Sequence, residues 1–155
     1  MDKIEELRYL IKAVDQEGEN NYRRMLAPLD ITPNQNEVLK ILSKKDGLSI
    51  SEIGDLLICG SDSPSRVIQR LLLKGAVSKE NDSSDARKSI IFITDKGLNL
   101  LKEAKKIENQ FNLQIKKSVE SKMNIDQLID MLEAQVQGTK SLNQIISKKK
   151  IDSNL

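Results

Sequence analysis

The segment from Ser61 to Gly97 restricts the fold most strongly, because a capped helix there is followed by two strand-like stretches. Ser63 and Pro64 mark a helix start: a Ser hydroxyl accepts hydrogen bonds from free backbone N–H groups, and Pro suits the first helical position. Gly75 marks the end, since glycine tolerates the left-handed backbone that often closes a helix. The sequence therefore predicts a short helix between these two signals, followed by extended structure.

This helix is predicted to have one apolar side and one polar side. Residues three and four positions apart form a stripe that should face a core: Val67, Ile68, Leu71 and Leu72. The other sides carry mainly hydroxyl, guanidinium and amide groups: Ser65, Arg66, Gln69, Arg70 and Leu73. One side therefore packs, while the opposite side offers polar groups to a partner.

After this helix the pattern becomes that of a β-hairpin. Residues 76–81 and 89–94 are strand-like, and they flank the polar loop 82–88, which carries Arg87 and Lys88. A short polar-faced helix followed by a hairpin with a basic tip is typical of a winged helix-turn-helix. In that motif the helix contacts base edges in the major groove, and the hairpin reaches along the DNA backbone.

Two helices are predicted before this segment. Thr32 and Gln35 form one capping-box pattern, and Ser49 and Glu52 form a second, so each pair indicates a helix start. The second helix is joined to the helix at Ser63 by the short turn 59–62. Two short helices connected in this way form a helix-turn-helix.

Long amphipathic helices are predicted on both sides of this head. Apolar residues recur at helical spacing over residues 4–29, and again from Thr94 to about Met123. The second helix would be about 40 Å long, which is more than a small head can cover. Asn124 then caps one last helix, with apolar residues as far as Ile145. These stripes predict a partner chain that completes the core.

Composition argues against several other classes of protein. The 155-residue chain has no His and a single Cys, so it lacks the commonest metal ligand, the usual general base and an intramolecular disulfide. We therefore expect no enzyme, metal or cofactor. The N-terminal residues contain no uninterrupted apolar run, which indicates neither a signal peptide nor a membrane span and favours the cytoplasm. Net charge is +2, so any case for nucleic acid rests on where the charges lie.

The ordered set of segments resembles the multiple-antibiotic-resistance regulators, the MarR family. Asp85 and Arg87 match the family's wing signature, and residues 94–97 match the entry to its long fifth helix. Gln69 stands where the family usually has an acidic residue, and Pro64 where it usually has an apolar one. The resemblance extends over these segments: ITPNQNEVLKIL (31–42), LSISEIGDLL (48–57), SRVIQRLLLKGAV (65–77) and SDARKSIIFITDKGLNLL (84–101).

The expected fold class is mainly α with a small β-hairpin (α+β): a winged helix-turn-helix with long N- and C-terminal dimerisation helices. Residues 31–97 are predicted to form the DNA-binding head, residues 1–30 and 98–147 the helical dimerisation region, and residues 148–155 a frayed tail. The resemblance implies a homodimer that regulates transcription on double-stranded DNA, most simply a repressor on a pseudo-palindromic operator.

The helix at Ser63 supplies the first group of candidate DNA contacts. Arg66 is a candidate ligand for a base edge or a phosphate, and the Gln69 amide can pair with adenine. Ser63 and Ser65 lie where backbone N–H groups favour a phosphate. Arg70 is the fifth candidate DNA contact. Its alternative role is structural, as a partner of a residue in the wing. The plainer alternatives for the others are a cap, a surface amide and a solvated helix face with an ordinary salt bridge.

The predicted wing supplies the second group. Arg87 and Lys88 are candidate contacts to the DNA backbone or the minor groove, and Asp85 can brace the Arg87 guanidinium by a charge-assisted hydrogen bond. The alternative is a soluble hairpin tip. Cys59 lies in the turn, where a redox role competes with that of a small buried apolar residue.

The resemblance also implies a small aromatic or phenolic effector, held between the dimer helices and the winged head. The nearest candidates are Tyr9, Tyr22, Arg23 and Met25. The alternative is that these side chains pack the dimer. A rival reading of the whole chain is a winged-helix adaptor that binds protein instead of DNA, and salt dependence of DNA binding would distinguish the two.

Overall fold

The computed structural model describes residues 1–58, 62–81 and 88–153. These residues are mainly helical, and a small antiparallel sheet completes the head, as the sequence predicted. The elements follow one another in this order: α1 (Lys3–Leu26), the 3-10 helix η1 (Ala27–Leu29), α2 (Pro33–Lys44), β1 (Leu48–Ser49), α3 (Ile50–Leu56), α4 (Pro64–Leu73), β2 (Val77–Asn81), β3 (Ser89–Ile93), α5 (Asp95–Glu120), α6 (Ile125–Gln135) and α7 (Lys140–Ser153).

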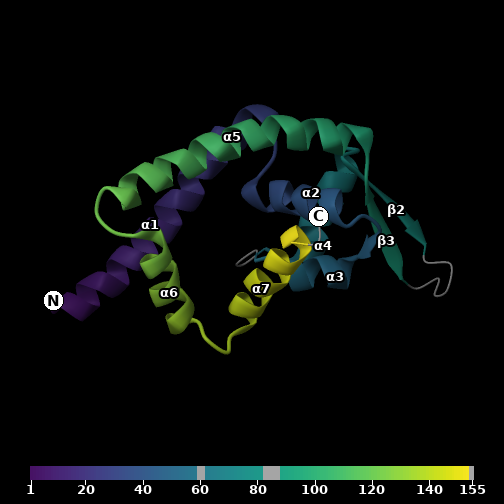
Figure 1. Ribbon diagram of the computed structural model, residues 1–155. Helices are drawn as coiled ribbons and strands as arrows, with labels where there is room; N and C mark the ends of the chain where they lie inside the picture. Colours follow the sequence, from purple (N-terminus) through teal and green to yellow (C-terminus); the bar gives the residue numbers. More distant parts are fainter. Residues whose placement is uncertain (59–61, 82–87, 154–155) are drawn as a thin grey trace.

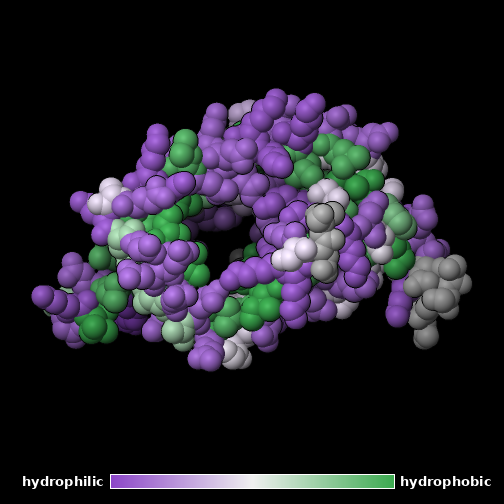
Figure 2. Space-filling view, in the orientation of Figure 1, coloured by the Kyte–Doolittle hydropathy of each residue, from purple (hydrophilic) through white to green (hydrophobic). Residues whose placement is uncertain are grey.

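The head is formed by α2, α3, α4 and the sheet, and the long helices α1 and α5 extend away from it (Figure 1). α6 and α7 then turn back, and α7 lies beside the head. The space-filling view shows an opening between these returning helices and the long pair (Figure 2).

The predicted capping boxes are confirmed. The Thr32 hydroxyl accepts a hydrogen bond from the Gln35 backbone N–H at 3.3 Å, and the Gln35 side chain accepts one from the Thr32 backbone N–H. Ser49 and Glu52 make the same reciprocal pair at the start of α3. These bonds satisfy N–H groups that have no partner inside the helix. The two helices that precede α4 are therefore fixed by local chemistry.

The end of α4 and the sheet also follow the sequence, with small differences at the boundaries. Gly75 has a φ of +67°, the left-handed geometry expected after a helix. The strand order is β1-β3-β2, so β1 adds a third strand to the predicted hairpin. β3 ends at Ile93 and not at Thr94, because Thr94 caps α5 and accepts a hydrogen bond from the Gly97 backbone N–H.

The core of the head gathers apolar side chains from α2, α3, α4 and the sheet. β3 contributes Ile91, which lies at the centre of the sheet. A second, smaller cluster consists of Leu26 on α1, Ala104 on α5 and Ile31, which lies just before α2. The main core consists of these buried residues: Val38, Leu39, Ile41, Leu42, Leu48, Ile53, Leu56, Leu57, Val67, Ile68, Leu71, Ala76, Val77 and Ile91.

Leu39→Ala should destabilise the head. Leu39 is 0% exposed, so truncation loses apolar burial and leaves a cavity worth about 3 kcal/mol of unfolding free energy. The matched control is Leu73→Ala, because Leu73 is 83% exposed on α4. Urea denaturation should show a large fall in midpoint for L39A and little change for L73A. Equal stability of the two variants would contradict this assignment of the core.

Three predictions about the long helices need correction. α1 ends at Leu26 and gives way to η1, because Pro28 has no N–H to continue the helix. α5 ends at Glu120 and not near Met123. The single last helix is two helices, α6 and α7, and Gly138 between them has a φ of +76°. A residue in that conformation ends an α-helix, so the chain reverses there.

Residues 148–153 also differ from the frayed tail that the sequence suggested. They form the last turns of α7, and Lys148 makes an ion pair with Glu37 at 2.6 Å. Lys44 makes another with Asp152, and Ile151 packs on the main core. Partners on α2 therefore hold this end of the chain in place.

Candidate nucleic-acid interface

α4 presents its polar residues to solvent, as the sequence predicted. Ser63, Ser65, Arg66, Gln69 and Arg70 are all exposed, whereas the helix buries its apolar side. Positions 65 and 69 are four residues apart, as are positions 66 and 70, so the members of each pair are neighbours on the helix surface. The Ser63 hydroxyl accepts a hydrogen bond from the Arg66 backbone N–H at 3.3 Å, so it caps α4. Contact of these five residues with DNA stays a prediction.

Among the described residues, the two arginines of α4 have no carboxylate partner. Within the described ranges, no acidic side chain lies within ion-pair distance of Arg66 or Arg70. The ordinary salt bridge considered from the sequence is therefore not formed with these parts of the chain. Exposed cations without an internal partner are available to an external anion, and phosphate is the anion that guanidinium groups match in geometry.

The wing is described only in part. Lys88 is exposed and directly precedes β3. It borders a hollow of about 250 Å³ together with Ser49, Ile50, Ser51 and Ser89, so the start of β3 lies beside the start of α3. The predicted contacts Asp85 and Arg87 lie outside the described residues, as does Cys59.

The four effector candidates do not converge within one chain. Tyr9 and Arg23 are exposed on α1, and Arg23 pairs with Glu19 on its own helix. Tyr22 is separated from Tyr9 by 13 positions, or about 20 Å of helix. Met25 is half-buried further along the same helix. Of the four, Tyr22 is the residue that joins the head to the long helices.

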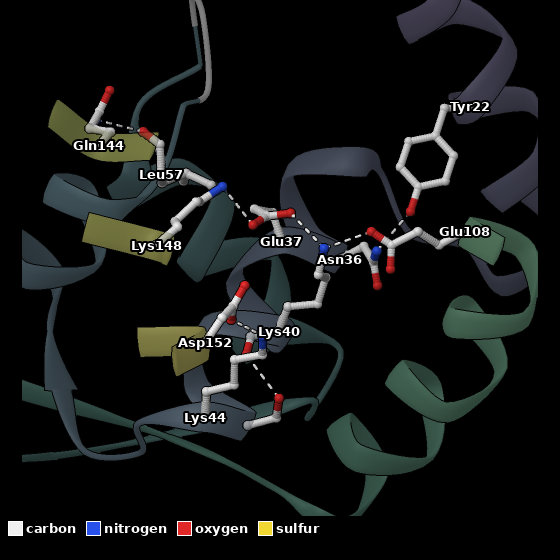
Figure 3. Close-up of polar contacts among 11 residues, drawn as sticks. Tyr22, Asn36, Glu37, Lys40, Lys44, Leu57, Glu108, Gln144, Lys148 and Asp152 are labelled. Atoms are coloured by element: carbon white, nitrogen blue, oxygen red, sulfur yellow. Dashed lines mark hydrogen bonds and ion pairs between the residues drawn. The ribbon is translucent and has the colours of Figure 1, made fainter. Parts of the chain in front are cut away.

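A group of polar residues surrounds Tyr22 where α1, α2, α5 and α7 meet. We call this group the junction cluster (Figure 3). Tyr22 stacks on Phe111 with ring centroids 4.6 Å apart, and its hydroxyl accepts a hydrogen bond from the Asn36 side chain at 2.8 Å. The Asn36 Oδ1 atom is buried and has no hydrogen-bond partner in the described structure. The cluster comprises Tyr22, Asn36, Glu37, Lys40, Glu108 and Lys148.

Ion pairs connect the rest of the junction cluster. Lys40 lies 2.6 Å from Glu108 and 3.4 Å from Glu37, and Lys148 lies 2.6 Å from Glu37. Burial alone would raise the pKa of Glu37, but hydrogen bonds and charge from Lys148 and Lys40 hold that pKa below its ordinary value. Burial alone would lower the pKa of Lys40, and Glu108 and Glu37 raise it instead. Both groups therefore stay charged at neutral pH.

Sequence reasoning missed most of the junction cluster. The Lys40–Glu37 pair lies three positions apart on one helix and was readable in principle. Lys40 and Glu108 are 68 positions apart, so no local pattern points to their contact. Only the packing of α5 on α2 brings them together.

Tyr22 should ionise at unusually high pH. Burial, and then the nearby Glu108 carboxylate, raise its pKa to about 12 from 10.0. Because the folded state holds the proton more tightly, this contribution to stability is complete below about pH 10 and is lost as the pH rises towards 12. Tyrosinate absorbance during a pH titration should show a late step that Tyr22→Phe removes and Tyr9→Phe keeps. A late step that persists in Y22F would contradict the assignment.

The described residues show neither a metal centre nor a membrane span. Across these ranges, no group of three or more His, Cys, Asp or Glu residues is placed to hold a metal ion. No helix there has the length and apolar character needed to cross a bilayer.

Comparison with known proteins identifies the head. Residues 31–89 match the sequence model of the MarR family. The chain carries a MarR-family domain. This domain contains α2, β1, α3, α4 and β2, and it ends at the first residue of β3.

Relatives of the MarR-family domain include one curated protein and many solved structures. The HTH-type transcriptional regulator TtmR of Methylorubrum extorquens strain PA1 is 39% identical over 79 residues, which is 51% of this chain and 40% of that protein. The chain thus matches less than half the length of this relative. TtmR is described as a transcriptional regulator of the helix-turn-helix type.

Two solved structures with DNA show the same fold. The transcriptional repressor CouR, bound to a 23-mer DNA duplex, is 26% identical with a TM-score of 0.76 and covers 88% of this chain and 97% of its own. A mutant MarR from E. coli, complexed with operator DNA, is 23% identical with a TM-score of 0.72 and covers 88% and 99%. The likeness extends beyond the MarR-family domain to the long helices.

Proposed function

We propose that the chain regulates transcription by binding double-stranded DNA through α4 and the β2–β3 hairpin. The observation that carries this proposal is the exposed polar side of α4, where Arg66 and Arg70 have no internal ion-pair partner among the described residues. α4 follows α3 along the chain, with only residues 57–63 between them. Two helices in close succession are typical of a motif that inserts the second helix into the major groove. The DNA duplexes bound to CouR and to the E. coli MarR mutant support the same reading.

Each exposed residue of α4 has a role that its chemistry suits. Arg66 binds a guanine edge or a phosphate, and Gln69 pairs with an adenine. Ser65 and the capped start of α4 at Ser63 bind a backbone phosphate. Arg70 adds a further phosphate contact.

The wing contacts DNA beside α4. Lys88, directly before β3, binds the phosphate backbone, and Arg87 reaches the minor groove with Asp85 as its brace. The latter two assignments rest on the sequence pattern. Such contacts position the protein on the duplex but carry little sequence information.

The active form is proposed to be a homodimer that represses transcription from a pseudo-palindromic operator. Apolar side chains lie exposed along α1, and apolar atoms gather over α1 and α6 in the space-filling view (Figure 2). A monomer rarely leaves so much apolar surface in contact with water. The exposed aliphatic residues of α1 are Ile4, Leu7, Leu10, Ile11 and Val14. Residues 1–30 and 98–147 would supply the interface, and residues 31–97 the head.

A small aromatic or phenolic anion is the proposed effector, with the junction cluster as the nearest feature. Tyr22 and Phe111 provide an aromatic pair there, and Asn36 Oδ1 is a buried acceptor, without a described partner, to which a phenolic hydroxyl can donate a hydrogen bond. A ligand bound between the head and the long helices would shift the spacing of the two heads. Operator affinity depends on both heads docking together, so that shift would release the repressor.

The salt dependence of binding to a labelled pool of random-sequence duplexes tests the proposal. Displacement of condensed counterions predicts affinity that falls steeply as salt rises. The rival is an adaptor that binds protein through the same winged head. Absence of binding to duplex DNA at low salt would overturn the proposed function in favour of that rival.

A further inference from the structure

α7 folds back onto the helix-turn-helix and does not extend the long helices (Figure 1). Its contact with the head centres on Gln144, which is 8% exposed. The Gln144 side-chain amide donates a hydrogen bond to the backbone carbonyl of Leu57 at 3.0 Å (Figure 3). It donates a second one to the backbone carbonyl of Gly54, also at 3.0 Å. A side chain from the end of the chain therefore binds the end of α3.

The end of α3 needs such a partner. The last backbone carbonyls of a helix receive no hydrogen bond from N–H groups within the helix. A glycine just after the helix often allows the following backbone N–H groups to bond to them. α3 has no such closure: Leu57 follows it in extended conformation, with φ −98° and ψ 118°. The amide of Gln144 satisfies these carbonyls from outside.

The same corner sets the start of α4. A Cβ atom added to Gly54 would lie 3.1 Å from Cγ of Pro64, the first residue of α4, so the two helices are tightly packed there. A hollow of about 380 Å³ beside the corner is lined by Gly54, Pro64 and Gln144, among others. The direction of α4 thus depends on a corner that α7 supports from behind.

The other contacts of α7 with the head are mostly ionic. Lys148 pairs with Glu37 at 2.6 Å, Asp152 pairs with Lys44, and Ile151 adds apolar contact with the main core. Gln144 is the buried residue of α7 in the described structure. Partly exposed ion pairs hold weakly and are screened by salt. The attachment of α7 is therefore of a kind that can open while the core of the head stays folded.

We propose that α7 is a strap that holds the α3–α4 corner, with Gln144 as its positioning residue. While the strap is closed, α4 is held in one orientation. Movement of α6 and α7 opens the strap, frees the α3 carbonyls and loosens the start of α4. The chain thus has a mechanical link between its long helices and its head. The effect on DNA affinity rests on the proposed function, whereas the link itself does not.

Hydrogen exchange of the full-length protein tests the strap without DNA. Gln144→Glu replaces the donor amide with a carboxylate that faces two carbonyl oxygens, so the bonds are lost. Backbone amides of α3 and the first turn of α4 should then exchange about tenfold faster than in the wild type. The matched control is Asn143→Asp, the same chemical change at the preceding, exposed position.

A second variant tests the ionic part of the strap. Lys148→Glu places a carboxylate opposite Glu37, and because the site is partly exposed the head should stay folded. The same α3 and α4 amides should exchange faster, although the ion pair of Lys148 is with Glu37 on α2. Its control is Lys150→Glu, since Lys150 is exposed on the same helix.

Two readouts separate the strap from the proposed function. Faster exchange in Q144E and K148E but not in their controls, with an unchanged cooperative melt of the main core, supports the strap. Wild-type exchange rates in both variants would overturn it. In Q144E, affinity for a selected duplex should fall about tenfold together with the faster amide exchange. If the wild type binds no duplex, the proposed function fails, and the exchange rates still test whether α7 holds the α3–α4 corner.

Discussion

Arg66→Ala should lower the affinity of the proposed dimer for its selected duplex by about a thousandfold. A well-placed arginine contact to a base is worth about 2 kcal/mol, and two copies per dimer at separate half-sites add to about 4 kcal/mol. Fluorescence anisotropy with one duplex at fixed salt measures the change. Core stability should be unaffected, because Arg66 is exposed and has no ion-pair partner among the described residues.

The control for charge is Lys105→Ala, which removes one exposed cation from α5. Its affinity should stay near that of the wild type. The salt slope separates two kinds of contact: loss of a phosphate ligand reduces the slope by about one per contact, whereas loss of a base ligand relaxes sequence preference. Unchanged affinity of R66A for the duplex would contradict the proposal that Arg66 on α4 contacts DNA.

Leu7→Glu combined with Val14→Glu should dissociate the proposed dimer. Leu7 and Val14 are seven positions apart on one side of α1 and are 49% and 71% exposed in the single chain. Unpaired carboxylates buried between subunits cost several kcal/mol, which raises the dimer dissociation constant by at least about a thousandfold. Because both residues contact solvent in the single chain, its own fold should persist.

Sedimentation equilibrium distinguishes the outcomes of this second experiment. The wild type should sediment as a dimer and the double variant as a folded monomer with weak operator binding. Asn20→Glu, an exposed change elsewhere on α1, is the control and should remain dimeric. A dimer that survives both carboxylates, or a wild-type monomer, would contradict the proposed interface.

Local sequence signals predicted the head well. The caps at Thr32, Ser49, Ser63 and Thr94 depend on residues within three positions, so their hydrogen bonds could be anticipated. Gly75 was predicted from its role after a helix for the same reason. The exposed polar side of α4 followed from helical spacing.

Long-range contacts could not be predicted in this way. Gln144 reaches Gly54 across 90 positions, and an amide in a helix carries no signal that it will bind the end of another helix. The division between α6 and α7 was missed although Gly138 indicated a break, because the apolar spacing continued past it. Local rules therefore gave the head and its exposed side, and missed the strap and the junction cluster.

Sequencing of duplexes selected from a random pool by the full-length protein tests the central claim most directly, namely that paired α4 helices bind DNA. A two-fold symmetric consensus is predicted, with half-sites whose centres lie about one helical turn apart. Enrichment of a single unpaired half-site, or of no sequence at all, would contradict it.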